Sequence, residues 1–143
     1  MNGLLAARSE VSALQRGLNE RRQLPEILIC PPATLLWALV GVVEKGAVKL
    51  GGQTCHVDEG GAHTGDISAE MLKDAGASYV IVGHSERRTD HHESSPLVAA
   101  QAKAAWRAGL AAIICIGVLT LGRRPFITMM SQNSQLNGHP REN

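Results

Sequence analysis

The chain has 143 residues, of which 44% are hydrophobic and 19% charged, as in ordinary globular domains. Its 14 Lys and Arg residues nearly balance 13 Asp and Glu residues, so no net basic field attracts nucleic acid. No apolar run is long enough to cross a bilayer, and no charged-plus-apolar leader is apparent. Three cysteines without close spacing (Cys30, Cys55 and Cys115) predict reduced thiols. We therefore expect a cytoplasmic globular protein with neither membrane nor nucleic-acid partners.

The first half of the chain alternates helical and strand patterns. Apolar spacing predicts a helix over residues 4–22, and residues 26–30 form a short apolar strand pattern. Thr34 is a candidate cap for a second helix over residues 35–43. A second strand is expected over residues 48–55, although two glycines inside it weaken that interpretation.

The second half continues the same rhythm after a glycine-rich loop. A serine cap and glycine stops mark its helices, and unbroken apolar runs mark its strands. The expected elements are a helix over 69–75 capped by Ser68 and stopped by Gly76, a strand over 79–82, a helix over 94–107 stopped by Gly109, and a strand over 111–116.

Strands that are apolar throughout are typical of a sheet covered on both faces, and the helices between them would supply the covers. The pattern therefore predicts parallel βα units. A doubly wound sheet and a (β/α)₈ barrel both fit it, because periodicity does not distinguish the two.

The stretch YVIVGHSERR, residues 79–88, places His84 just after an apolar strand, where functional groups of parallel α/β proteins gather. Ser85 and Glu86 can open a short helix, whose partial positive charge disfavours an imidazolium. A neutral imidazole can donate an N–H, polarise a carbonyl and stabilise an enediolate. A structural histidine that anchors a turn fits these residues equally well.

Longer segments carry a family resemblance. The stretches AEMLKDAGASYVIVGHSERR, HTGDIS, GLAAIICIG and the opening MNG resemble triosephosphate isomerase over residues 1–117. The resemblance implies an α/β fold that is a fragment of a TIM (β/α)₈ barrel, about strands two to five with their helices. It also implies a homodimer and a reaction of glycolysis and gluconeogenesis. That reaction interconverts dihydroxyacetone phosphate and glyceraldehyde 3-phosphate by proton transfer through an enediolate, without a cofactor.

The same resemblance implies roles for particular residues. His84 matches the catalytic electrophile, and Glu86 matches a supporting carboxylate beside the substrate-binding lysine. Ser85 lies between them, Cys115 lies behind the site, and Arg87 makes structural ion pairs in the family.

The loop GGAHTGD, residues 60–66, resembles the family's dimer-contact loop. Thr64 and Gly65 would then contact a second subunit, and Met1 and Asn2 would lie in the receiving region. A flexible surface loop is the alternative. A phosphate cradle is disfavoured, because the loop lacks the lysine and spacing of a P-loop.

Departures from the family are also visible. The family's substrate-binding lysine stands before MNG, and its base glutamate lies on the sixth strand; neither has a counterpart here. Residues 118–143 do not resemble the family and are expected to form an irregular tail. We therefore expect little or no isomerase activity from the isolated chain. The alternative function is that of an inactive remnant acting only by association with a partner subunit.

Histidines and paired arginines raise two further possibilities. The histidine positions (56, 63, 84, 91 and 92) lack the regular spacing of a structural zinc site, so no metal is expected. The arginine pairs at 87–88 and 123–124 lack interleaved aromatics, which are 3% of the chain, so solvated or ion-paired arginines are expected.

Overall fold

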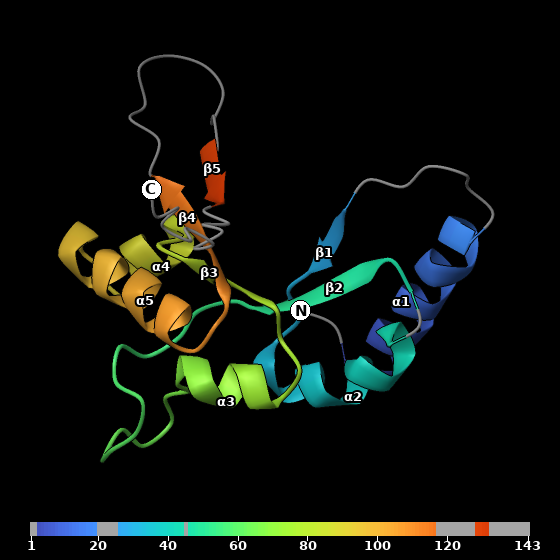
Figure 1. The fold of residues 1–143 in the computed structure, drawn as a ribbon, viewed down its shortest axis with the longest axis horizontal. Helices are drawn as coiled ribbons and strands as arrows, with labels where there is room; N and C mark the ends of the chain where they lie inside the picture. The colour runs from blue at the N-terminus through green and yellow to red at the C-terminus, as the bar shows by residue number, and fades with distance from the viewer. Residues whose placement is uncertain (1–2, 20–25, 45, 117–127, 132–143) are drawn as a thin grey trace, which may run out of the picture.

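The computed structural model describes residues 3–19, 26–44, 46–116 and 128–131 (Figure 1). Helices and strands alternate along the chain, as the sequence predicts. In order, the elements are α1 (Leu4–Asn19), β1 (Ile27–Ile29), α2 (Ala33–Val43), β2 (Val48–Gly52), α3 (Ala69–Asp74), β3 (Tyr79–Val82), α4 (Ser85–Asp90), α5 (Ser95–Arg107), β4 (Ala111–Ile116) and β5 (Thr128–Ser131).

The strands form one sheet in the order β1-β2-β3-β4-β5, and the first four are parallel. Ile27 pairs with Val48, and Val80 pairs with Ala112, so the register follows the apolar runs. Parallel neighbours place their carboxyl ends at one edge of the sheet, which gathers the residues that follow them. The expected βα architecture is confirmed.

The last strand, β5, pairs antiparallel with β4. It lies in the tail that we expected to be irregular, so that expectation is wrong for residues 128–131. The rest of the tail, residues 118–127 and 132–143, lies outside the described residues. The domain boundary at residue 117 stays a prediction.

The core lies between the sheet and its helices. Figure 1 shows α2 and α3 below the strands and α5 beside β3 and β4; α2 contacts β2, α5 contacts β3 and β4, and α3 contacts α5. Leu36, Leu39, Val80 and Val82 are its largest fully buried side chains. Burial of such aliphatic side chains, at about 1.5–3 kcal/mol each, is the main stabilising contribution.

Burial differs between the two faces of the sheet, most clearly in β3. In β3, Val80 and Val82 are buried whereas Tyr79 and Ile81 are half-buried, and Lys49 in β2 is exposed. The expectation of strands equally covered on both faces is therefore wrong for this chain. Helices cover one face, while the opposite face would be the interior of a closed barrel, which four parallel strands do not enclose.

Two element boundaries differ from expectation. The second helix begins at Ala33 after Pro32, so Thr34 is not its cap. Proline suits this position because its fixed φ is already compatible with a helix start. The strand expected to end near Cys55 ends at Gly52, and a Cβ there would lie 2.6 Å from Leu72 Cδ1. The glycine therefore permits close packing of α3 on the strand.

The serine cap of α3 and the glycine stops are confirmed. Ser68 accepts a hydrogen bond from the amide of Met71, and Ser94, which was expected to be the first residue of the helix, caps α5 in the same manner. Gly76 and Gly109 have φ of 94° and 73°, the left-handed region that ends a helix at low cost. Helices in the described part of the chain are all too short or too polar to cross a membrane.

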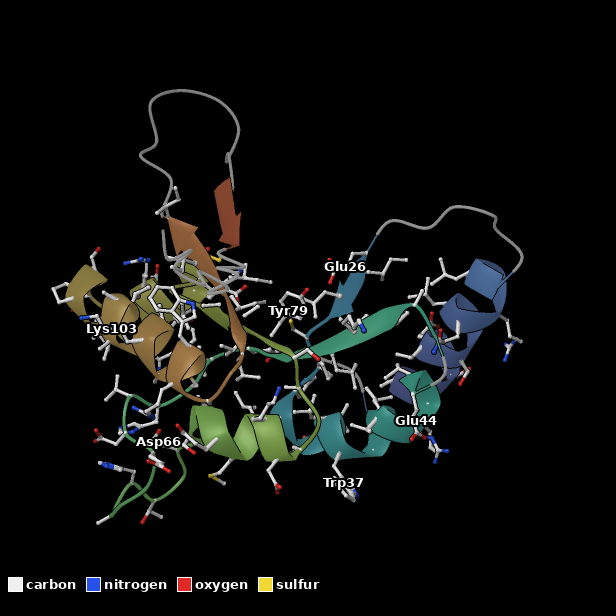
Figure 2. The ribbon with its side chains drawn as sticks, in the orientation of Figure 1. Glu26, Trp37, Glu44, Asp66, Tyr79 and Lys103 are labelled. Atoms are coloured by element: carbon white, nitrogen blue, oxygen red, sulfur yellow. The ribbon has the colours of Figure 1, made fainter. Side chains whose placement is uncertain are left out.

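One side-chain hydrogen bond joins distant parts of the fold at the amino ends of the strands. The hydroxyl of Tyr79, at the start of β3, donates to the carboxylate of Glu26, just before β1 (Figure 2). This bond raises the pKa of Tyr79, because an adjacent carboxylate disfavours the phenolate.

Candidate active site

His84 follows β3 and is the N-cap residue of α4, so strand and helix together fix its position. Gly83 makes the turn between them at φ 71°. A Cβ at Gly83 would lie 2.7 Å from Val98 Cγ1 and 2.8 Å from Arg88 Nη2. The turn that delivers the imidazole to the edge of the sheet therefore requires glycine.

The hydrogen bond to His84 selects one tautomer of its neutral ring. The backbone amide of Glu86 donates to His84 Nδ1 at 3.4 Å. A neutral imidazole whose Nδ1 accepts a hydrogen bond carries its proton on Nε2. The ring can therefore donate from Nε2 to an oxygen atom of a ligand.

Glu86 lies beside the same nitrogen, with its Oε2 3.7 Å from His84 Nδ1. The side chains of His84 and Glu86 are 40% and 82% exposed, so water screens this pair. Ser85, between them, is exposed as the first residue of α4. The structure thus brings together the three residues that the sequence analysis singled out here.

A cavity of about 340 Å³ adjoins His84. Its lining includes Cys30 after β1 and Gln53 after β2, so it lies at the carboxyl ends of three parallel strands. Gln53 Nε2 donates to the carbonyl of Cys30 at 3.0 Å and joins the first two strand ends. Burial raises the pKa of the Cys30 thiol to about 11, so it is protonated and unreactive at neutral pH.

Arg87, in the helix that follows His84, forms an ion pair with Glu93. Its Nε lies 2.6 Å from Glu93 Oε1, and Gln101 Nε2 donates to the same oxygen at 3.2 Å. The Glu93 side chain is only 3% exposed and that of Arg87 is 32% exposed, so this ion pair joins a buried carboxylate to a half-buried guanidinium. It connects α4 to the segment before α5, and it is the kind of ion pair that the resemblance implies for Arg87.

The sequence analysis did not identify the contacts of Arg88. Its Nε donates to the carbonyl of Gly83 at 2.8 Å, and its Nη2 donates to the carbonyl of Cys115 at 3.2 Å. Arg88 therefore ties the histidine turn to β4. Cys115 is a buried free thiol, and burial raises its pKa. The only sequence signal for this tie was a second arginine after Glu86.

The residues proposed for a dimer contact lie elsewhere. Thr64 and Gly65 are exposed on the loop between β2 and α3, which extends away from the sheet (Figure 1). Met1 and Asn2 lie outside the described residues.

The same loop holds a group that the sequence spacing did not reveal. His56, Asp58 and His63 present ligand atoms within 4.8 Å of one another and form, within the described residues, the one cluster suited to a metal ion.

Four parallel strands with helices between them and a histidine at their carboxyl ends fit a piece of a (β/α)₈ barrel. Comparison with solved structures supports this class. A crystal structure of triosephosphate isomerase from Bartonella henselae matches with a TM-score of 0.77 and 52% identity, over 82% of this chain and 48% of that one. The expectation of a TIM-barrel fragment is confirmed, with β1–β4 curled as half of the barrel.

Sequence comparison identifies the family. The profile described as triosephosphate isomerase matches residues 1–138. The triosephosphate isomerase of Afipia carboxidovorans is 56% identical over 117 residues, 82% of this chain and 47% of that protein. That of Bradyrhizobium sp. strain ORS 278 is 53% identical over 137 residues, 95% of this chain and 55% of that protein. The chain belongs to the triosephosphate isomerase family.

Two features of these matches concern how much of each chain is aligned. The chain spans about half the length of these relatives. The profile match also extends past residue 117, into the segment in which we saw no resemblance.

Proposed function

We propose that this chain carries the electrophilic half of a triosephosphate isomerase site, with His84 as the electrophile and a triose phosphate as the substrate. The single observation that carries the proposal is the hydrogen bond from the Glu86 amide to His84 Nδ1. It leaves the Nε2 proton of a neutral ring available beside a cavity at the strand ends.

The chemistry follows from where charge develops. Removing a proton from the carbon beside a carbonyl leaves an enediolate, whose negative charge gathers on the carbonyl oxygen. A hydrogen bond from His84 Nε2 to that oxygen would strengthen as the charge develops. Triosephosphate isomerase is itself the established example of a neutral histidine used in this way. The reaction requires no cofactor.

The matched half supplies only part of the machinery. The base that abstracts the proton and the ammonium that binds the substrate would come from the half of the relatives that this chain does not span. A general base contributes about 10²–10⁴-fold to such a reaction. We therefore expect the isolated chain to be inactive or nearly so, with Glu86 as a supporting carboxylate and Ser85, Arg87 and Cys115 as positioning residues.

A chimera tests the role of His84. Residues 3–116 of this chain would replace the corresponding half of the Bartonella henselae enzyme, and isomerisation would be followed with a coupled dehydrogenase. The chimera should be active, and His84→Gln should lower its kcat by about 10²–10⁴-fold. The matched control is His92→Gln, since His92 is an exposed residue that lies outside the cavity lining. Equal kcat in the chimera and in its His84→Gln variant would refute the assignment.

The isolated chain provides the second arm of the experiment. Turnover at a few per cent of a full-length enzyme, abolished by His84→Ala, would contradict the expected inactivity.

A non-catalytic role is the second candidate function, and the exposed loop carrying Thr64 and Gly65 favours it. We propose that this loop contacts a second subunit, with Met1 and Asn2 in the receiving region, as in a homodimer of the family. We further propose that the protein is cytoplasmic and that its partners include neither nucleic acid nor membrane. Sedimentation velocity should detect a dimer, and a clean monomer at all concentrations would exclude this role.

A further inference from the structure

We propose that the loop over residues 56–66 binds a divalent transition-metal ion of the zinc class through His56 Nδ1, Asp58 Oδ2 and His63 Nε2. Figure 2 labels Asp66 at one end of this loop, where nitrogen- and oxygen-bearing side chains gather away from the strands. The three ligand residues do not include His84, and the proposal does not depend on isomerase activity.

The spacing of the three ligand atoms suits such an ion. Zinc bonds of 2.0–2.2 Å in a tetrahedral arrangement place neighbouring ligand atoms about 3.3 Å apart. His63 Nε2 lies 3.1 Å from Asp58 Oδ2, and His56 Nδ1 lies 4.0 Å from the same oxygen. The second distance must shorten, and the ligand atoms of the two histidines lie within 4.8 Å of each other. The side chains of His56 and Asp58 reach partly into solvent, where they can move.

The donor set also favours this class of ion. Imidazole nitrogen is a preferred ligand of zinc, copper and nickel, whereas magnesium and calcium prefer oxygen. Two imidazoles and one carboxylate therefore select a transition metal. Three protein ligands leave the fourth tetrahedral position to water.

The loop is already held in the required shape by backbone bonds. The amide of His56 donates to the carbonyl of Ile67 at 2.8 Å, and the amide of Asp66 donates to the carbonyl of His63 at 3.0 Å. Arg107 Nη1 donates to the carbonyl of Val57 at 3.1 Å. The backbone that carries the ligands is therefore ordered before an ion binds, which lowers the entropic cost of binding.

The rings of His56 and His63 are also adjacent, with centroids 4.0 Å apart. Because the rings are adjacent, one ion could bind both His56 Nδ1 and His63 Nε2.

Asp66 provides the outer support of the site. Its Oδ2 lies 3.8 Å from His56 Nε2, on the side of the ring opposite Nδ1. When Nδ1 binds an ion, the proton of the ring is on Nε2 and faces this carboxylate. A carboxylate that orients a metal-bound histidine is a recurrent feature of metal sites. Asp58 and Asp66 together also balance the charge of a divalent ion.

Binding replaces one existing contact. The amide of Asp58 donates to His56 Nδ1 at 3.0 Å, and the ion would take over that lone pair. Asp58 is exposed, so water can accept the released amide hydrogen bond.

Calorimetric titration of the full 143-residue chain with Zn²⁺ tests the site. We expect saturable binding of one ion per chain. His63→Ala should weaken binding more than 100-fold, and Asp66→Asn about 10–100-fold, as for other outer-shell carboxylates. The control is His92→Ala, which removes an exposed imidazole outside the loop and outside the cavity lined by His56 and Asp66, and which should bind as the wild type does.

Cobalt(II) spectroscopy distinguishes this site from adventitious binding to thiols. Nitrogen and oxygen ligands should give a tetrahedral visible spectrum without a thiolate charge-transfer band. Circular dichroism would check that each variant is folded, with Asp58→Asn as a second ligand variant. The proposal is overturned by absent or unsaturable Zn²⁺ binding, by a thiolate band, by wild-type affinity in His63→Ala, or by loss of binding in the control.

Discussion

Replacing Arg87 with alanine should destabilise the fold more than most single substitutions. The carboxylate of Glu93 is 3% exposed and has two partners on one oxygen, Arg87 at 2.6 Å and Gln101 at 3.2 Å. Its other oxygen has no hydrogen-bond partner within the described residues. The substitution would leave a buried negative charge with an amide as its remaining donor.

The size of the effect follows from this burial. Leaving a buried charge without its partner costs about 3–5 kcal/mol, because that charge stays desolvated; the 32% exposure of Arg87 places the expected loss at the lower end of this range. Domains of this size unfold with about 5–15 kcal/mol in total. Arg87→Ala should therefore remove a large share of the stability. Urea denaturation followed by circular dichroism would measure the loss in free energy of unfolding.

Two further variants isolate the buried charge as the cause. Arg8→Ala, at an exposed position of α1, should change the free energy of unfolding by no more than about 0.5 kcal/mol. The double variant Arg87→Met with Glu93→Leu removes both charges and should recover most of the loss. A loss below about 1 kcal/mol in Arg87→Ala, or a double variant as unstable as the single, would refute the reasoning.

Three other predictions concern a glycine, a helix cap and a thiol. Gly83→Ala should cost more stability than Gly109→Ala, because both have positive φ but only a Cβ at Gly83 meets other atoms within 4 Å; equal losses in urea would contradict this. Ser68→Ala should cost about 1 kcal/mol of unfolding free energy through the lost cap, and Thr34→Ala less; a larger loss at Thr34 would be contrary evidence. Burial favours the neutral thiol of Cys30, so its thiolate forms only as pH rises towards about 11. Its alkylation rate, located by peptide mapping, should still increase above pH 9, and a plateau below that value would contradict the assigned burial.

Local chemistry in the sequence was sufficient to predict most elements. Ser68 offers a hydroxyl to the amides at the start of α3, and Gly76 accepts the left-handed turn at its end. These preferences act over a few residues, so they can be recognised before the fold is known. Family resemblance then identified the barrel, which periodicity had left open, and implied the role of His84.

Local signals failed where a neighbour in space decides the outcome. Thr34 has good capping chemistry, but Pro32 begins the helix. Gly52 resembles a break in a strand, yet it belongs to β2 because Leu72 packs against it. The alternating burial of β3 depends on how many strands enclose the face of the sheet opposite the helices. The residues of β3 do not determine that number.

The amino-acid sequence by itself determined the order of helices and strands up to β4, the serine cap of α3, and the histidine at the end of β3. Only the tertiary structure decided which side chains meet. Arg88 bridges Gly83 to Cys115, and the loop brings His56 to His63, because backbone closure places residues within bonding distance irrespective of their spacing along the chain. Such long-range contacts arise from packing, to which local conformational preferences contribute only in part.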